Sequence, residues 1–210
     1  MSVVFLSYFL GEETPAYGGA EGTLKFEQIR AIDRGDTSNN LYLKLPNHIG
    51  THIDFPRHFN NEGKSMSDYP ADFWIFNRVG FIHSDMDSLE LSCKGLPDDI
   101  ELLIVKTGFG DQRNENIYWA GQPVVPASAA EMLRKRFPHL RVFGFDLISL
   151  TSQLNKAEGK KAHLAFLTEQ NILVLEDMNL NNLFSTPERV IIAPLQISNA
   201  DGVPCTVIAF

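Results

Sequence analysis

The 210-residue chain is predicted to fold as a single mixed α/β domain, residues 1–210, and three observations support this. Short runs of β-branched and aromatic residues, each bounded by turn residues, outnumber the helical segments. Strands and helices alternate along the second half of the chain, as they do in α/β domains. The chain is 44% hydrophobic, which is enough to build a sizeable core at this length.

Nine segments are predicted as strands from their residue types and flanking turns. They are residues 3–9, 24–32, 41–45, 78–84, 102–107, 142–146, 172–175, 190–194 and 206–210. The clearest helix covers residues 127–137, because Pro126 suits a helix start and the segment contains good helix formers. A second helix is predicted over residues 161–168. The glycine-rich segment 11–22 is predicted to be a mobile loop that could close over a site.

Charge and composition exclude several classes of partner. The chain has 18 Lys and Arg against 26 Asp and Glu, a net charge of −8, so no basic surface for nucleic acid is expected. The apolar start at residues 3–6 has no basic residue before it and no cleavage site after it, and no window approaches the ~18 apolar residues of a membrane helix. We therefore expect a cytoplasmic protein with no membrane partner. Cys93 and Cys205 are too few for a disulfide framework and are expected to be buried apolar thiols.

The most informative segment is residues 47–59, which hold three of the six histidines and one aspartate. A glycine, two β-branched residues and a proline disfavour a helix here, so the segment is predicted to be extended or looped. In an extended chain alternate side chains share one face, so His48, His52, Asp54 and His58 are expected to point the same way.

This set of side chains predicts a site for a divalent metal ion. Imidazole nitrogens and carboxylates are ligands that Zn²⁺ and Mn²⁺ accept, and one carboxylate can bridge two ions. Zn²⁺ is the first expectation and Mn²⁺ the second, with one or two ions bound. The alternative is that the three histidines lie together without binding metal. The sequence has no Gly-x-Ser-x-Gly elbow and no phosphate-binding glycine loop, which disfavours a serine hydrolase and a nucleotide enzyme.

Other polar residues are weaker candidates. Glu176 ends an apolar run and must be compensated if it is buried, whereas Asp177 is expected to point the opposite way into solvent. Asp146 is expected to form structural hydrogen bonds more readily than to bind metal. His83 and His139 have no carboxylate at metal-binding spacing and are expected to be structural.

The pattern His48-x-Gly50-Thr51-His52-x-Asp54-x-Pro56-x-His58-Phe59 resembles the signature of the metal-dependent cyclase-like hydrolase family, of the bacterial kynurenine formamidase and isatin hydrolase type. Further matches extend the resemblance over almost the whole chain: Thr14-Pro15-x-Tyr17, Thr107-Gly108, Ala162-His163-x-x-Phe166-Leu167, residues 172–176, Pro194-Leu195-x-Ile197 and Ala200-Asp201-Gly202-x-Pro204.

The resemblance implies a swivelling β/β/α fold, assembled as a homodimer or a higher homo-oligomer. It implies His58 as proton donor and acceptor, and it implies five metal ligands: His48, His52, Asp54, His163 and Glu176. From the residues alone, His163 is as readily an exposed helix residue.

The resemblance also implies a small-molecule amide as substrate, hydrolysed at its carbon–nitrogen bond by metal-activated water. An aryl formamide such as N-formylkynurenine is the first expectation, and an isatin-type lactam or another cyclic amide is the second. A third reading is a metal-binding or small-molecule-binding protein without catalysis. Phe55 and Phe59 flank ligand positions and are expected to line the pocket with Tyr17. Tyr17 stands where the formamidase carries a tryptophan, so a smaller or more polar substrate is expected.

Overall fold

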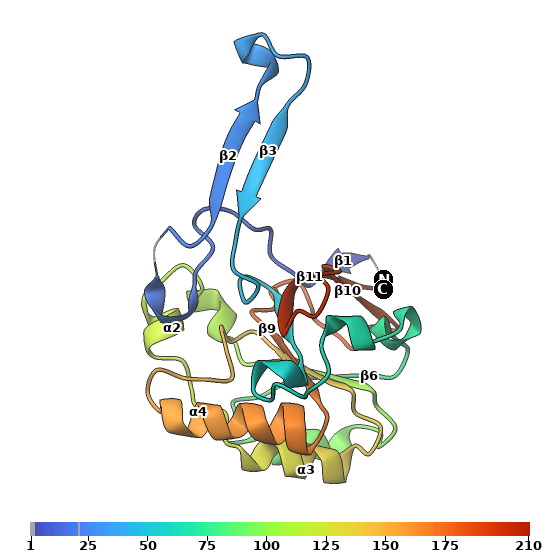
Figure 1. Ribbon diagram of the computed structural model, residues 1–210. Coiled ribbons are helices and arrows are strands. Elements are labelled where there is room, and N and C mark those ends of the chain that lie inside the picture. The colour runs from blue at the N-terminus through green and yellow to red at the C-terminus, as the bar shows by residue number, and fades with distance from the viewer. Residues whose placement is uncertain (1–2, 21) are drawn as a thin grey trace.

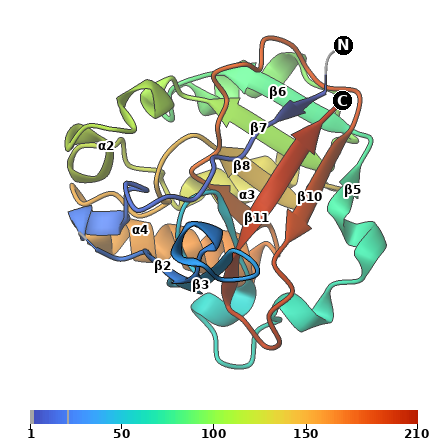
Figure 2. The same cartoon turned by 90° about the horizontal axis from the view of Figure 1, so that it is seen from above.

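The computed structural model describes residues 3–20 and 22–210 of the chain. It has one large curved sheet with a barrel-like shape, and helices pack against one side of it (Figure 1, Figure 2). The strand order is β5-β10-β11-β4-β9-β8-β7-β6, and β1 pairs with β11. Strands β6 to β9 run parallel to their neighbours, and the rest of the sheet is antiparallel. The fold is therefore mixed α/β, as predicted.

The strands of the large sheet agree with most of the predicted segments. Their bounds are β1 Val4–Phe5, β4 His52–Asp54, β5 Ile75–Phe76, β6 Val79–His83, β7 Leu102–Lys106, β8 Val142–Phe145, β9 Leu173–Glu176, β10 Val190–Pro194 and β11 Gly202–Ala209. The central strands β7, β8 and β9 are almost entirely buried, which explains their uninterrupted apolar sequences.

Two strand predictions were wrong in extent. The first strand covers only Val4–Phe5, because beyond it the chain keeps a single bridge, between Ser7 and Met178. The last strand begins at Gly202 and not at Thr206, since Gly202 and Pro204 pair with Asp54 and His52 of β4. Glycine and proline disfavour strands, which is why residue types alone do not indicate this first half.

The helices are α1 Leu89–Ser92, α2 Ile117–Ala120, α3 Ser128–Arg136 and α4 Lys156–His163. Helix α3 confirms the prediction for residues 127–137. The prediction of a helix over 161–168 was displaced, because α4 starts earlier, where the Asn155 side chain accepts a hydrogen bond from the Glu158 amide, and continues as a π-helical turn over Leu164–Glu169. Gly159 disfavours a helix by its residue type, but packing requires it there, because a Cβ would lie 2.5 Å from the Thr151 hydroxyl.

Strands β2 Lys25–Arg30 and β3 Asn40–Lys44 form a separate two-stranded hairpin that projects from the body of the molecule (Figure 1). We call this hairpin the arm. Within residues 3–20 and 22–210, no helix is both long enough and apolar enough to cross a membrane. Both cysteines are free and buried, as predicted, and burial raises the pKa of the Cys93 thiol to about 11.

Candidate active site

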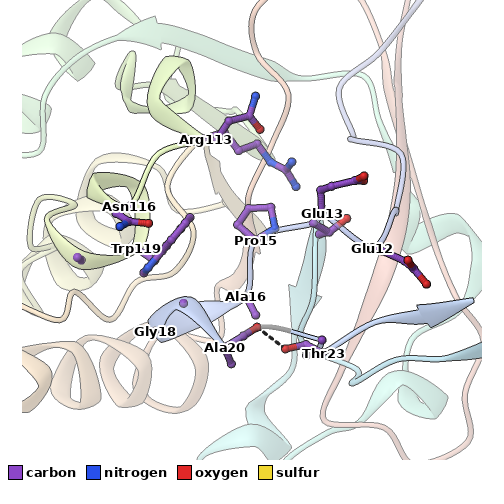
Figure 3. Close-up of a pocket in the computed structure, with 15 residues that line it drawn as sticks. Glu12, Glu13, Pro15, Ala16, Gly18, Ala20, Thr23, Arg113, Asn116 and Trp119 are labelled. Carbon is purple, nitrogen blue, oxygen red and sulfur yellow. Dashed lines mark hydrogen bonds between the residues drawn. The ribbon is translucent and has the colours of Figure 1, made fainter.

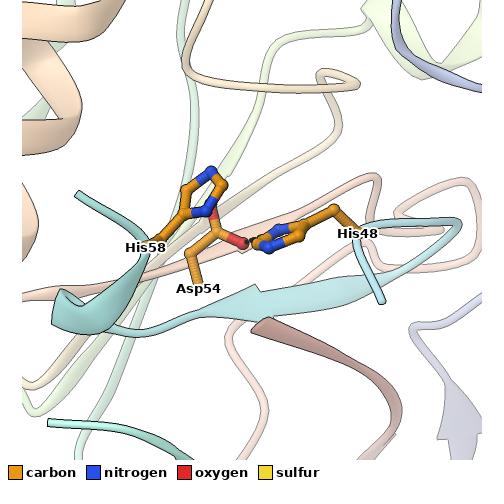
Figure 4. Close-up of side chains that lie close together, drawn as sticks. All are labelled: His48, Asp54 and His58. Atoms are coloured by element: carbon orange, nitrogen blue, oxygen red, sulfur yellow. Dashed lines mark hydrogen bonds and ion pairs between the residues drawn. The ribbon is translucent and has the colours of Figure 1, made fainter. Parts of the chain in front are cut away.

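The predicted site residues meet at one place on the large sheet. His52 and Asp54 point from β4, and His58 follows in the short helical turn Pro56–His58 (Figure 4). Strand β9 lies beside β4 with Glu176 directly opposite His52. His163, the last residue of α4, completes the group. The fold thus brings together residues that are more than 100 positions apart in the sequence.

Four ligand atoms converge at the centre of this group. The Nε2 atom of His52 lies 3.4 Å from Asp54 Oδ1 and 3.3 Å from Glu176 Oε2. The Nε2 atom of His163 lies 3.6 Å from an oxygen of each of the same carboxylates. These separations are longer than good N–H···O hydrogen bonds.

Backbone carbonyls fix the orientation of both imidazoles. His52 Nδ1 donates to the carbonyl of Gly50 at 2.8 Å, and His163 Nδ1 donates to the carbonyl of Gly159 at 2.9 Å. With the proton held on Nδ1, each Nε2 lone pair is directed at the carboxylates. This is the arrangement of histidines that bind metal ions through Nε2.

The two carboxylates are buried together, with Asp54 1% exposed and Glu176 2% exposed. Burial alone would raise the pKa of Asp54, but its contacts with His163 and His48 hold that pKa well below its ordinary value. Burial also opposes charge on the histidines, yet Glu176 and Asp54 raise the pKa of His52 to about 9. The same carboxylates raise the pKa of His163 to about 10. The site therefore requires positive charge, as protons or as a cation.

These donors fit a divalent cation. Among the residues described, two groups of possible ligands have donor atoms within 4.8 Å of one another: His48, Asp54 and His58, and His52, Asp54 and Glu176. Asp54 belongs to both groups, so its two oxygens could serve one ion or bridge two. Imidazole nitrogen and carboxylate oxygen suit Zn²⁺ and Mn²⁺.

Asp201 organises the outer part of the site, and sequence reasoning assigned it no role. Its Oδ2 accepts from His58 Nδ1 at 2.9 Å and lies 3.1 Å from His48 Nε2, while its Oδ1 accepts from Asn47 at 2.6 Å. Burial raises the pKa of Asp201, but the bonds with His58 and His48 lower it overall, so the carboxylate is charged. Its only sequence indication was its place in the family-like Ala200–Pro204 pattern. Gly202 beside it admits His48, because a Cβ there would overlap that ring.

A cavity of about 320 Å³ opens onto the metal-ligand candidates. Tyr17 and Phe59 line it, as predicted, together with Ile49 and Ile148. Phe59 also stacks on the His163 ring at 4.6 Å between centroids. The prediction for Phe55 was wrong: this ring is fully buried against Tyr69 and Trp74, because it follows Asp54 in the chain and points to the opposite side.

Gln122 supports the ligand residues from behind, and sequence reasoning missed it. Its fully buried side chain donates to the carbonyls of Ser149 and Thr151 and accepts from the amides of Ile148 and Ser149. The same loop contacts the ligands, since the Leu150 amide donates to Glu176 at 2.6 Å and the Thr151 hydroxyl lies 3.2 Å from His163 Nδ1. Gln122 thus fixes the loop that holds two of the expected ligands.

The expectation that Asp177 is solvated was wrong. The strand ends at Glu176 and Asp177 has a positive φ of 51°, so strict alternation no longer applies. Its carboxylate is 1% exposed, forms an ion pair with Arg113 at 2.7 Å and accepts from Tyr118 at 2.6 Å. Asp146 has the structural role predicted for it, accepting from the amide and hydroxyl of Thr107.

The family model named Cyclase, described as "Putative cyclase", matches residues 4–151. The chain belongs to the Cyclase family. A curated Cyclase-family relative, "Kynurenine formamidase" of Bacillus cereus, is 30% identical over 165 residues, covering 77% of this chain and 75% of the relative.

Solved structures share the fold over nearly the full length. Isatin hydrolase A from Labrenzia aggregata, bound to benzyl benzoate, superposes with a TM-score of 0.81 at 21% identity, covering 99% of this chain and 93% of the other. A structure described as a potential metal-dependent hydrolase with cyclase activity gives a TM-score of 0.77 at 18% identity, covering 99% and 96%. These likenesses confirm the Cyclase-family fold of the chain.

Proposed function

We propose that this protein is a metal-dependent hydrolase that cleaves the carbon–nitrogen bond of an amide, with an aryl formamide such as N-formylkynurenine as substrate. One observation carries the proposal: the Nε2 atoms of His52 and His163 and the carboxylates of Asp54 and Glu176 converge beside a cavity that His58 also lines. The relative named kynurenine formamidase supports the substrate class.

His48, His52, Asp54, His163 and Glu176 would hold the cation, which is Zn²⁺ first and Mn²⁺ second in our proposal. When bound, a divalent ion of this kind lowers the pKa of a water molecule and polarises a carbonyl oxygen. Phe59 and the backbone hydrogen bonds of His52 and His163 fix the ligand geometry before substrate arrives.

His58 is the proposed acid–base residue. Its Nδ1 proton is held by the charged Asp201 carboxylate, which leaves the Nε2 lone pair available to the cavity. Nε2 would accept a proton from the attacking water and return it to the leaving nitrogen. The resulting imidazolium is stabilised by Asp201, which compensates the charge that forms on the ring.

A cyclic amide such as an isatin-type lactam is the second candidate substrate. Tyr17 favours it, because this side chain lines the cavity, is 39% exposed and adds a hydroxyl that can bond a polar group on a ring. A binding protein without catalysis is the less favoured alternative, since it would have no use for the proton exchange that the His58–Asp201 pair permits.

The test is a panel of aryl formamides, lactams and lactones with metal-loaded protein, compared with His58→Ala. We expect turnover by the wild type and its loss in the variant, with metal content unchanged. Turnover of no member of the panel would contradict the enzyme proposal. Loss of metal together with activity would show that His58 is a ligand and that its assigned role is wrong.

A further inference from the structure

The arm exposes apolar side chains that nothing in the rest of the described chain covers (Figure 1). All five residues of β3 are exposed, and in β2 only Phe26 is partly buried. The register pairs Phe26 with Leu43 and Gln28 with Leu41, which puts Phe26, Leu41 and Leu43 on one face. Leu41 is 46% exposed and Leu43 is 51% exposed. An isolated two-stranded hairpin is at best marginally stable in water, so this face requires a partner surface.

The arm is attached to the body through a small apolar cluster, separate from the main core. The cluster consists of Ala16, Leu24 and Ile49, with Leu10, Phe26 and Leu45 packed around it. Ala16 adjoins Tyr17, and Ile49 adjoins His48. The base of the arm is therefore continuous with two walls of the active-site cavity.

A groove of about 890 Å³ lies beside the base of the arm (Figure 3). Glu12 and Glu13 line it on one side and Arg113 and Trp119 on the other, with Pro15 between them. Pro15 also lines the active-site cavity, so residues 14–20 separate the groove from the active site. We call residues 14–20 the site wall. Two consecutive glycines with positive φ, Gly18 and Gly19, leave this wall with little side-chain support of its own.

The charges of the arm and of the body are complementary. The arm segment, residues 25–44, has four basic residues against three acidic ones, a net charge of +1, which leaves −9 for the rest of the chain. The arm's arginines, Arg30 and Arg34, are exposed, and Glu13 is exposed at the groove. A second copy of this chain therefore offers an acidic, partly apolar groove to a basic, partly apolar arm.

We propose that two copies of this chain exchange arms, each arm lying in the groove of its partner and supporting the partner's site wall from outside. The contact is reciprocal, because each copy has one arm and one groove, as a two-fold dimer requires. Occupation of the groove would hold Tyr17 in place along the active-site cavity. The dependence of activity on this contact rests on the proposed hydrolase function, whereas the dimer itself does not.

Charge reversal tests the pairing directly. One variant carries Arg30→Glu and Arg34→Glu in the arm, and a second carries Glu12→Arg and Glu13→Arg at the groove. Each alone places like charges at both contacts and should sediment as a monomer. Mixed in equal amounts they should form a heterodimer, because the reversed arm then meets the reversed groove and the unchanged arm meets the unchanged groove. Failure of the mixture to associate would overturn the pairing of arm with groove.

Leu41→Asp tests the apolar face, with Leu91→Asp as its control, since Leu91 is 66% exposed on α1 of the body. We expect sedimentation velocity to give a dimer for the wild type and Leu91→Asp and a monomer for Leu41→Asp. Amide hydrolysis should fall at least tenfold in Leu41→Asp with metal content retained. A monomeric wild type, or a dimer that survives Leu41→Asp, would refute the exchange. A dimeric wild type that hydrolyses no amide would contradict the proposed function and leave the exchange standing.

Discussion

Replacing Asp201 by Asn should slow the reaction about tenfold while leaving the metal in place. Asp201 presents acceptor oxygens on both sides, to His58 and His48 and to Asn47. An amide has one acceptor oxygen, so one of these donors would face an NH₂ group. A hydrogen bond to a charged group is worth about 1.5–3 kcal/mol, and because the Asp201 side chain is 37% exposed we expect the lower end. About 1.4 kcal/mol corresponds to a tenfold change in rate.

The assay is kcat/KM for an aryl formamide, with metal content measured on the same preparation. Asp98→Asn, an exposed carboxylate on a distant loop, is the matched control and should have no effect. In a His58→Ala background, Asp201→Asn should cost little more, because the residue acts through His58. A full tenfold loss in that background would refute the reasoning and assign Asp201 an independent role.

Three further predictions concern the site and its support. Gln122→Leu should lower the free energy of unfolding by about 3–5 kcal/mol, since it leaves buried carbonyls and amides of the 148–151 loop unpaired, and should weaken metal binding about tenfold or more, as measured by chemical denaturation and chelator competition. Metal uptake at pH 7 should release protons, seen as buffer-dependent heats in calorimetry, because the pKa values of His52 and His163 are raised to about 9 and 10. The stability these two protonated histidines give the metal-free protein is complete below their unfolded pKa of about 6.5 and is lost as the pH rises through 9–10, so its Tm should fall over that interval, and a flat profile would contradict the assignment. Tyr17→Trp should raise kcat/KM for N-formylkynurenine relative to lactams, and an unchanged ratio would place Tyr17 outside the substrate contacts.

The residues of the 47–59 segment were predictable because their chemistry is local. Alternation along a short strand puts His52 and Asp54 on one face, and the same rule should have excluded Phe55, which points into the core. The π-helical turn after α4 and the early start of β11 were not predictable, because their local residue types disfavour them and tertiary contacts decide.

The supporting residues were beyond the reach of sequence patterns. Gln122 lies in a surface-like stretch next to Gly121 and Pro123, and its burial depends on a loop almost thirty residues later. Asp177 was misassigned because the backbone turns into a positive φ where alternation would have put the side chain in solvent. In both cases the partner, not the local sequence, decides the environment.

Elemental analysis of protein purified without chelator tests the central claim most directly. We expect about one or two equivalents of a transition metal per chain, lost on Glu176→Gln and His52→Ala and retained in the surface variant Leu91→Asp. Well under one equivalent of any transition metal, not restored by adding Zn²⁺ or Mn²⁺, would contradict the metal site and the hydrolase proposal that depends on it.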